Sequence, residues 1–125
     1  MKNSINDFGL LILRVGFSGM LLTHGVPKIN ILLDNPSGFA DPLGVGGTVS
    51  LIMAIIGEVV APILVLIGFK TRIAAIPAIA TMAVAAFVVH INDPFGVKEK
   101  ALLYLIGFIV IAMVGPGRYS VDGGK

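Results

Sequence analysis

The sequence predicts an all-α protein: a bundle of four transmembrane helices, antiparallel in up-down-up-down order, within one domain of residues 1–125. Two properties of the composition support this prediction. Hydrophobic residues make up 56% of the chain, and charged residues make up 13%, against about a quarter in a typical soluble domain. The mean hydropathy is +0.98. A soluble domain of this length must cover its surface with polar groups, and this chain has too few of them.

The third observation is a set of four apolar segments that are long enough to cross a bilayer, which takes about 20 residues. We expect helices over about 7–25, 48–69, 72–90 and 99–114. Their apolar residues lie on every side of the helix, which is typical of helices in lipid. The segments are too long and too rich in alanine to be strands.

Residues that begin or end helices mark the first two segments. Asp7 can cap the first, which Arg14 interrupts and which no small-residue cleavage pattern follows, so we interpret it as a retained helix rather than a signal peptide. Thr48 can cap the second, and Gly68 lies at its end.

The third and fourth segments have similar markers. Pro77 lies in or just after the first turn of the third segment, where proline is tolerated, and residues 92–94 end it. The run 115–117, Gly-Pro-Gly, ends the fourth segment. Short connections join the second, third and fourth helices, so neighbours in the sequence should be antiparallel neighbours in space.

The connection between the first two helices, residues 27–47, is much longer and is rich in proline and glycine. Loops of this length are often functional. Its apolar pieces, 29–33 and 43–45, suggest that it packs onto the bundle or dips into the membrane interface. The alternative is a flexible connector.

With four spans, both termini and the 70–72 turn lie on one side of the membrane. That side carries five basic residues and the other three, namely Lys2, Lys70, Arg72, Arg118 and Lys125 against Lys28, Lys98 and Lys100. The expected location is the inner (plasma) membrane, and the positive-inside rule then predicts cytoplasmic termini.

Two classes of function are excluded by composition. The basic residues are spread along the chain and form no cluster, so we expect no binding to nucleic acid. The chain has no cysteine, which excludes dithiol chemistry, thiolate metal sites and disulfides.

Ionisable residues inside a membrane span are costly and are therefore site candidates. Glu58 is the strongest, because it lies about 15 Å from either end of the second helix and is too short to reach water. Pro62 has no N–H, so the carbonyl of Glu58 loses its helical partner and a break in the helix is expected. Broken helices near the midplane often form binding sites; the alternative is a structural ion pair.

Arg14 is the expected partner of Glu58 in such an ion pair, since its long side chain can bridge the difference in depth. The alternative is that Arg14 extends toward the cytoplasmic head groups.

His24, His90 and Glu99 lie at the outer ends of three helices, where they could join Glu58 in one polar pocket under the 27–47 loop. We expect these four residues to bind a ligand or handle protons. They would be an acceptable metal set, but no local ligand spacing demands a metal, so none is predicted. Glu99 can instead simply complement the helix dipole.

The chain resembles the DoxX/DoxD family of small four-helix membrane proteins over nearly its whole length. No single motif is strong, but the ordered set is specific: residues 13–16, 23–28, 57–58, 66–75, 82–85 with His90, 99–104 and 115–122. The 27–47 loop departs from the family pattern. The residues that correspond are Arg14, His24, Glu58, His90, Glu99 and Arg118 with Asp122.

The resemblance implies a membrane subunit or accessory of an oxidoreductase system, linked to quinone, thiosulfate, or thiol and oxidative stress. A quinone is the implied cofactor, and an oxidoreductase protein the implied partner besides the lipid bilayer. Whether the chain is itself an enzyme, and which residues would be catalytic, does not follow. The alternatives are a non-enzymatic scaffold, with the 115–122 motif facing its partner, and a small transporter, which would need a homo-oligomer because four helices enclose little room.

Overall fold

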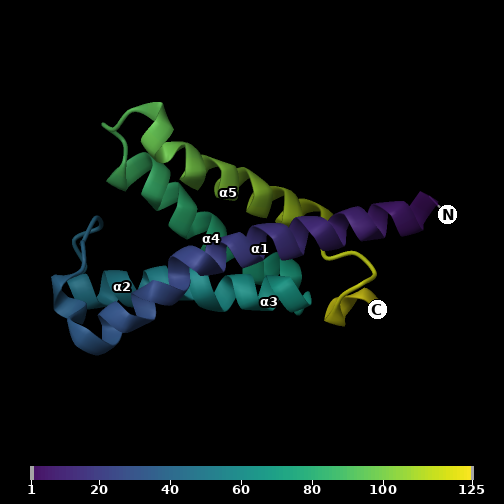
Figure 1. Ribbon diagram of the computed structural model, residues 1–125, viewed down its shortest axis with the longest axis horizontal. Coiled ribbons are helices and arrows are strands. Elements are labelled where there is room, and N and C mark those ends of the chain that lie inside the picture. The colour runs from purple at the N-terminus through teal and green to yellow at the C-terminus, as the bar shows by residue number, and fades with distance from the viewer. Residues whose placement is uncertain (1, 125) are drawn as a thin grey trace.

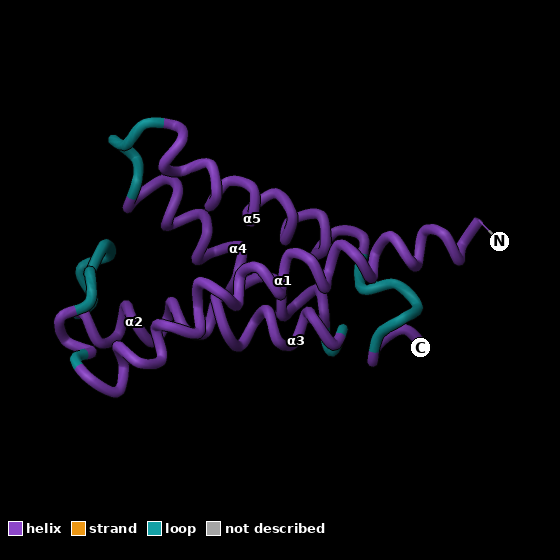
Figure 2. Tube along the Cα trace, in the orientation of Figure 1, coloured by secondary structure: helices purple, strands orange, loops and turns teal. Residues whose placement is uncertain are grey.

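The computed structural model describes residues 2–124, and within them the chain is helical with no β-strand. The described chain consists of five α-helices, two π-helical segments and two short 3-10 turns with their connections (Figures 1 and 2). In chain order the elements are α1 (Lys2–Asp34), η1 (Pro36–Gly38), α2 (Gly47–Ile55), η2 (Ile56–Val60), α3 (Ala61–Ile67), α4 (Thr71–Val84), η3 (Ala85–Val89), α5 (Phe95–Val114) and η4 (Val121–Gly124).

Three continuous helices are long and apolar enough to cross a membrane: Ser4–Asp34, Gly47–Ile67 and Thr71–Val89. The second consists of α2, η2 and α3, and the third of α4 and η3. Helix α5 has 20 residues, but every 18-residue window in it contains the charged residues Lys98, Glu99 and Lys100. The prediction of an all-helical membrane protein is confirmed for these three helices.

The second and third helices agree with the predicted 48–69 and 72–90 to within about two residues. Helix α5 begins at Phe95, directly after Pro94, rather than near residue 99. Helix α1 differs most, because it begins at Lys2 rather than Asp7 and continues through Pro27 to Asp34. Asp7 therefore does not cap the helix; its carboxylate accepts a hydrogen bond from the Arg118 backbone N–H, 3.2 Å away.

The prediction of a loop over 27–47 is therefore wrong for residues 27–34, which belong to α1. The connection between α1 and α2 is residues 35–46. Pro27 costs α1 only one hydrogen bond, the one that the Thr23 carbonyl would accept. The half-buried Ile29 and Leu32 lie at helical spacing, and their packing supports continuation of the helix.

Asp41 organises the remaining loop. Its two carboxylate oxygens accept hydrogen bonds from the backbone N–H groups of Val45 (2.9 Å) and Gly46 (2.8 Å) and from Ser50 Oγ (2.8 Å). The Gly46 hydrogen bond, followed by that of Ser50, lowers the pKa of Asp41 below its ordinary value. The charged carboxylate thus joins the loop to the first turn of α2.

The core lies between α1, α3, α4 and α5, and its fully buried side chains include Leu21, Val65, Phe108 and Ile111. Small residues let the helices approach closely. Ala74, Ala75, Ala78 and Ala86 are buried on the α4–η3 helix. A Cβ on Gly107 of α5 would lie 2.4 Å from the Phe17 ring, so α5 and α1 touch there.

Both ends of the chain lie at the same end of the molecule, opposite the 35–46 loop (Figure 1). The connection before α4 and the segment after α5 lie at this terminal end (Figure 2). Residue 125 and the side chain of Lys2, both used in the charge count above, lie outside the described residues. The 35–46 loop and the turn between η3 and α5 lie at the opposite end, which we call the loop end.

Candidate functional site

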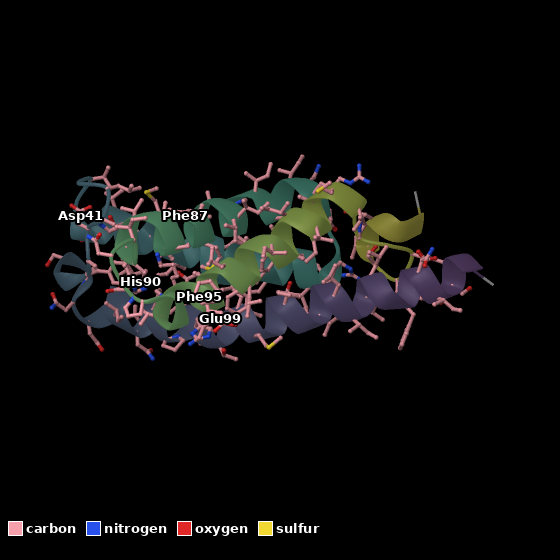
Figure 3. The ribbon with its side chains drawn as sticks, turned by 90° about the horizontal axis from the view of Figure 1, so that it is seen from above. Asp41, Phe87, His90, Phe95 and Glu99 are labelled. Carbon is pink, nitrogen blue, oxygen red and sulfur yellow. The ribbon has the colours of Figure 1, made fainter. Side chains whose placement is uncertain are left out.

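A cavity of about 570 Å³ opens at the loop end, between α1, the α2–η2 segment, the α4–η3 segment and α5. Most of its wall is apolar, and the loop contributes Phe39, Ala40, Pro42 and Leu43. The polar lining residues are His24, Lys28, Ser50, Glu58, Thr81, His90, Lys100 and Tyr104. Figure 3 shows Asp41 and His90 at this same end. The loop therefore packs against the bundle at this cavity, which agrees with the prediction of a packed loop rather than with that of a flexible connector.

Two glycines determine where Glu58 lies. A Cβ on Gly25 would lie 2.2 Å from the Glu58 carbonyl oxygen, so the backbones of α1 and η2 touch at this point. A Cβ on Gly57 would lie 1.9 Å from Thr81 Oγ1 and 2.9 Å from the Pro77 carbonyl oxygen of α4. Only glycine allows such close contacts, and together they hold the Glu58 backbone between two helices.

The helix around Glu58 is π-helical over Ile56–Val60, and the Ala61 N–H donates to the Ile56 carbonyl, five residues back. This segment ends two residues before Pro62, whose missing N–H removes the ordinary partner of the Glu58 carbonyl. The predicted break at Glu58 is thus present as a π segment rather than an open gap. A second π segment, Ala85–Val89, also contributes to the cavity wall, and π segments often mark functional sites.

Glu58 is 6% exposed and forms an ion pair with Lys28, whose Nζ lies 2.7 Å from its Oε1. Lys28 Nζ also donates to the carbonyl of His24, one turn earlier in α1, at 3.3 Å. Our sequence reasoning missed Lys28 because it placed this residue in a loop. The signal was the spacing of four between His24 and Lys28, which brings both residues to one face only if the helix continues past Pro27.

The predicted pairing of Arg14 with Glu58 does not occur. Arg14 is 1% exposed and lies near the terminal end, where its guanidinium donates to four backbone carbonyls. Nε donates to Pro116 (2.8 Å), Nη1 to Val65 (3.0 Å) and Leu66 (2.7 Å), and Nη2 to Tyr119. Arg14 is fourteen positions before Lys28, or about 21 Å along the helix, which is too far from the level of Glu58.

The two histidines are at the cavity, as predicted. The His24 ring contacts the Tyr104 ring edge to face, with 5.8 Å between centroids. His90 Nδ1 lies 2.8 Å from an oxygen of Asp93, which is an ion pair when the histidine is protonated. Tyr104 was not a predicted site residue, and its sequence context of apolar neighbours offered no signal for it.

Glu99 is not at the cavity but is exposed, and the next residue, Lys100, lines the wall instead. Successive residues of a helix point about 100° apart, so Lys100 faces the cavity while Glu99 faces away from it. Among the described residues, no three His, Asp or Glu side chains come together to hold a metal ion. The site therefore consists of an apolar chamber with Lys28–Glu58 in its wall and hydrogen-bonding groups around it, which suits a ligand with an oxygen-bearing head and an apolar body.

Comparison with known proteins gives a consistent result. The model of the DoxX family matches residues 9–91. The inner membrane protein YqjF of Escherichia coli is 30% identical over 122 residues, covering 94% of this chain and 92% of that protein. An uncharacterized protein of Haemophilus influenzae is 32% identical over 120 residues, covering 90% of this chain and 87% of that protein. No solved structure matches the chain significantly.

Proposed function

Because this chain belongs to the DoxX family, we propose that it is a multi-pass inner-membrane protein whose cavity around Glu58 binds a quinone-type ligand in the service of an oxidoreductase system. The observation that carries the proposal is the cavity of about 570 Å³, with apolar walls and a buried Lys28–Glu58 pair. An ionic pair in such a place is expensive and is by default a functional feature.

The membrane topology belongs to the same proposal. We assign α5 as a fourth span, because its 20 residues are about 30 Å long and its charged residues 98–100 lie in its first two turns, toward the loop end. The four spans then run up, down, up and down within one domain of residues 1–125. In the sequence, the side of the termini carries five basic residues and the loop side three, which supports cytoplasmic termini. The name of the Escherichia coli relative supports the inner membrane.

A quinone fits the chemistry of the cavity wall. Its ring and tail would pack on the apolar side chains, and its carbonyl oxygens would accept hydrogen bonds from Lys28 and from the His24 and Tyr104 groups. The chain has no cysteine, so it would position a quinone and exchange protons with it while a partner protein supplies electrons. Protonatable groups beside the ligand, Glu58 above all, would exchange those protons with the quinone.

The test is quinone binding by a Glu58→Gln variant. We expect its dissociation constant for a short-tailed ubiquinone analogue to rise about tenfold, equivalent to about 1.4 kcal/mol, because Lys28 loses the carboxylate that holds it at the cavity wall. Binding is measured by titration of the protein in nanodiscs made from quinone-free lipid.

The matched control is Glu99→Gln, since Glu99 is exposed and does not line the cavity. This variant should bind the analogue like the unaltered protein. Unchanged affinity in Glu58→Gln, or an equal loss in both variants, is incompatible with a quinone site at Glu58.

A further inference from the structure

Once the pairs within the protein are accounted for, three polar side chains are left in the cavity wall, and each of them can donate a hydrogen bond. Ser50 Oγ donates to Asp41, and Thr81 Oγ1 donates to the Pro77 carbonyl, both at 2.8 Å. His90 is engaged with Asp93, and Lys28 with Glu58. Among the described residues, the lining side chains without a hydrogen-bond partner are Tyr104, the His24 ring and Lys100.

Tyr104 is the most informative of the three. It is 8% exposed, and its hydroxyl makes no hydrogen bond to any residue between 2 and 124. In the described part of the chain, the hydroxyl that is fully buried without a partner is that of Ser18, so the Tyr104 hydroxyl faces the open cavity, where it can donate to a ligand. The adjacent His24 ring likewise has no hydrogen-bond partner within the described chain. A ligand oxygen that accepts from these groups would satisfy them.

The charge of the cavity points the same way. Lys28 and Glu58 neutralise each other at 2.7 Å, which leaves the ammonium of Lys100. No carboxylate of the described residues pairs with Lys100, and Glu99 beside it in the sequence does not line the cavity. The lining thus has an excess of one positive charge, carried by a lysine that is exposed overall and contributes to the cavity wall.

We propose that the ligand of this cavity carries an anionic oxygen head on an apolar body, with Lys100, Tyr104 and His24 binding the charged oxygen. This deepens the proposed function, on which it rests, by specifying the charge of the ligand. Two kinds of molecule have this chemistry: an acidic quinone, such as a hydroxynaphthoquinone that is ionised at neutral pH, and a fatty-acid carboxylate. The neutral forms of both lack the charge that Lys100 is placed to bind.

The experiment compares ligands that differ only in charge. The first pair is an alkyl-substituted 2-hydroxy-1,4-naphthoquinone and its 2-methoxy analogue, and the second is palmitate and methyl palmitate. Each is titrated at pH 7 into the protein in nanodiscs of zwitterionic lipid. We expect the anion of each pair to bind about tenfold more tightly, since one charge-assisted hydrogen bond is worth that much or more.

The variant Lys100→Gln should reduce this preference to about twofold or less, while leaving the affinity for the neutral member of each pair nearly unchanged. The control is Lys98→Gln, because Lys98 lies on the same helix but donates to the Ile91 carbonyl at 3.2 Å and does not line the cavity. It should keep the full preference.

The results separate the two proposals. Equal binding of the charged and neutral members, or a preference that survives in Lys100→Gln, overturns the anionic head and leaves the quinone site standing if both quinones bind. A preference confined to palmitate, with neither quinone bound, overturns the quinone function and retains the anionic head. If no ligand binds, both proposals are wrong.

Discussion

Replacing Arg14 by alanine should cost the fold roughly 3 kcal/mol or more, because it leaves several buried or half-buried carbonyls without a donor, at about 1–3 kcal/mol each. Arg14 joins three parts of the chain: α1, the end of α3 and the segment after α5. That segment should detach from the bundle in the variant. The free energy of unfolding in mixed micelles measures the first effect, and hydrogen exchange over 115–124 measures the second.

Two further variants make this result specific. Arg118→Ala removes the same kind of side chain at the same end of the molecule, but Arg118 is exposed, so stability should change little. Arg14→Lys keeps the charge but has fewer donors than the guanidinium fork, and we expect an intermediate loss. Equal stability of Arg14→Ala and Arg118→Ala would show that the four carbonyl contacts do not hold the C-terminal segment.

The substitution Gly25→Ala should also have a large effect, both on stability and on ligand binding. The added Cβ would lie 2.2 Å from the Glu58 carbonyl oxygen, which is backbone and cannot move away as a side chain can. Overpacking of this kind typically costs about 1–3 kcal/mol. The helices must separate where Lys28 meets Glu58, so the affinity for a quinone should fall together with the stability. Thermal unfolding and quinone titration of the same sample measure both.

Gly19→Ala is the matched control, since Gly19 lies in the same helix and nothing lies within 4 Å of its added Cβ. Alanine favours a helix over glycine by about 1 kcal/mol, so this variant should be as stable as the original or slightly more stable. If Gly25→Ala behaves like Gly19→Ala, then α1 does not touch the Glu58 backbone as described.

The helices could be predicted from the sequence because lipid imposes a simple rule: long apolar runs without charge become spans. The end of α1 could not, since Gly25 and Pro27 are ordinarily signs of a helix end. Gly25 is instead required by the contact with Glu58. In a packed membrane helix the loss of one hydrogen bond at Pro27 is tolerated.

The candidate site was predicted in part. Glu58, His24 and His90 share the cavity because it extends from the outer helix ends, where the sequence places the histidines, inward to the depth of Glu58. Rotation about a helix axis is not visible in a sequence whose helices are apolar all round, so Glu99 was chosen where Lys100 faces the cavity. Lys28 was missed because Gly25 and Pro27 suggested that the helix ends before it.

Photolabelling with an azidoquinone in lipid membranes tests the central claim, a quinone site at Glu58, most directly. After illumination, labelled residues are located by mass spectrometry, with and without an excess of unlabelled quinone. We predict label on the cavity wall, in the stretches 24–28, 53–58, 81–90 and 100–104, that unlabelled quinone removes and that Glu58→Gln reduces. Label spread over exposed apolar residues such as Ile12, Ile73 and Met113, and unaffected by competition, would contradict the claim.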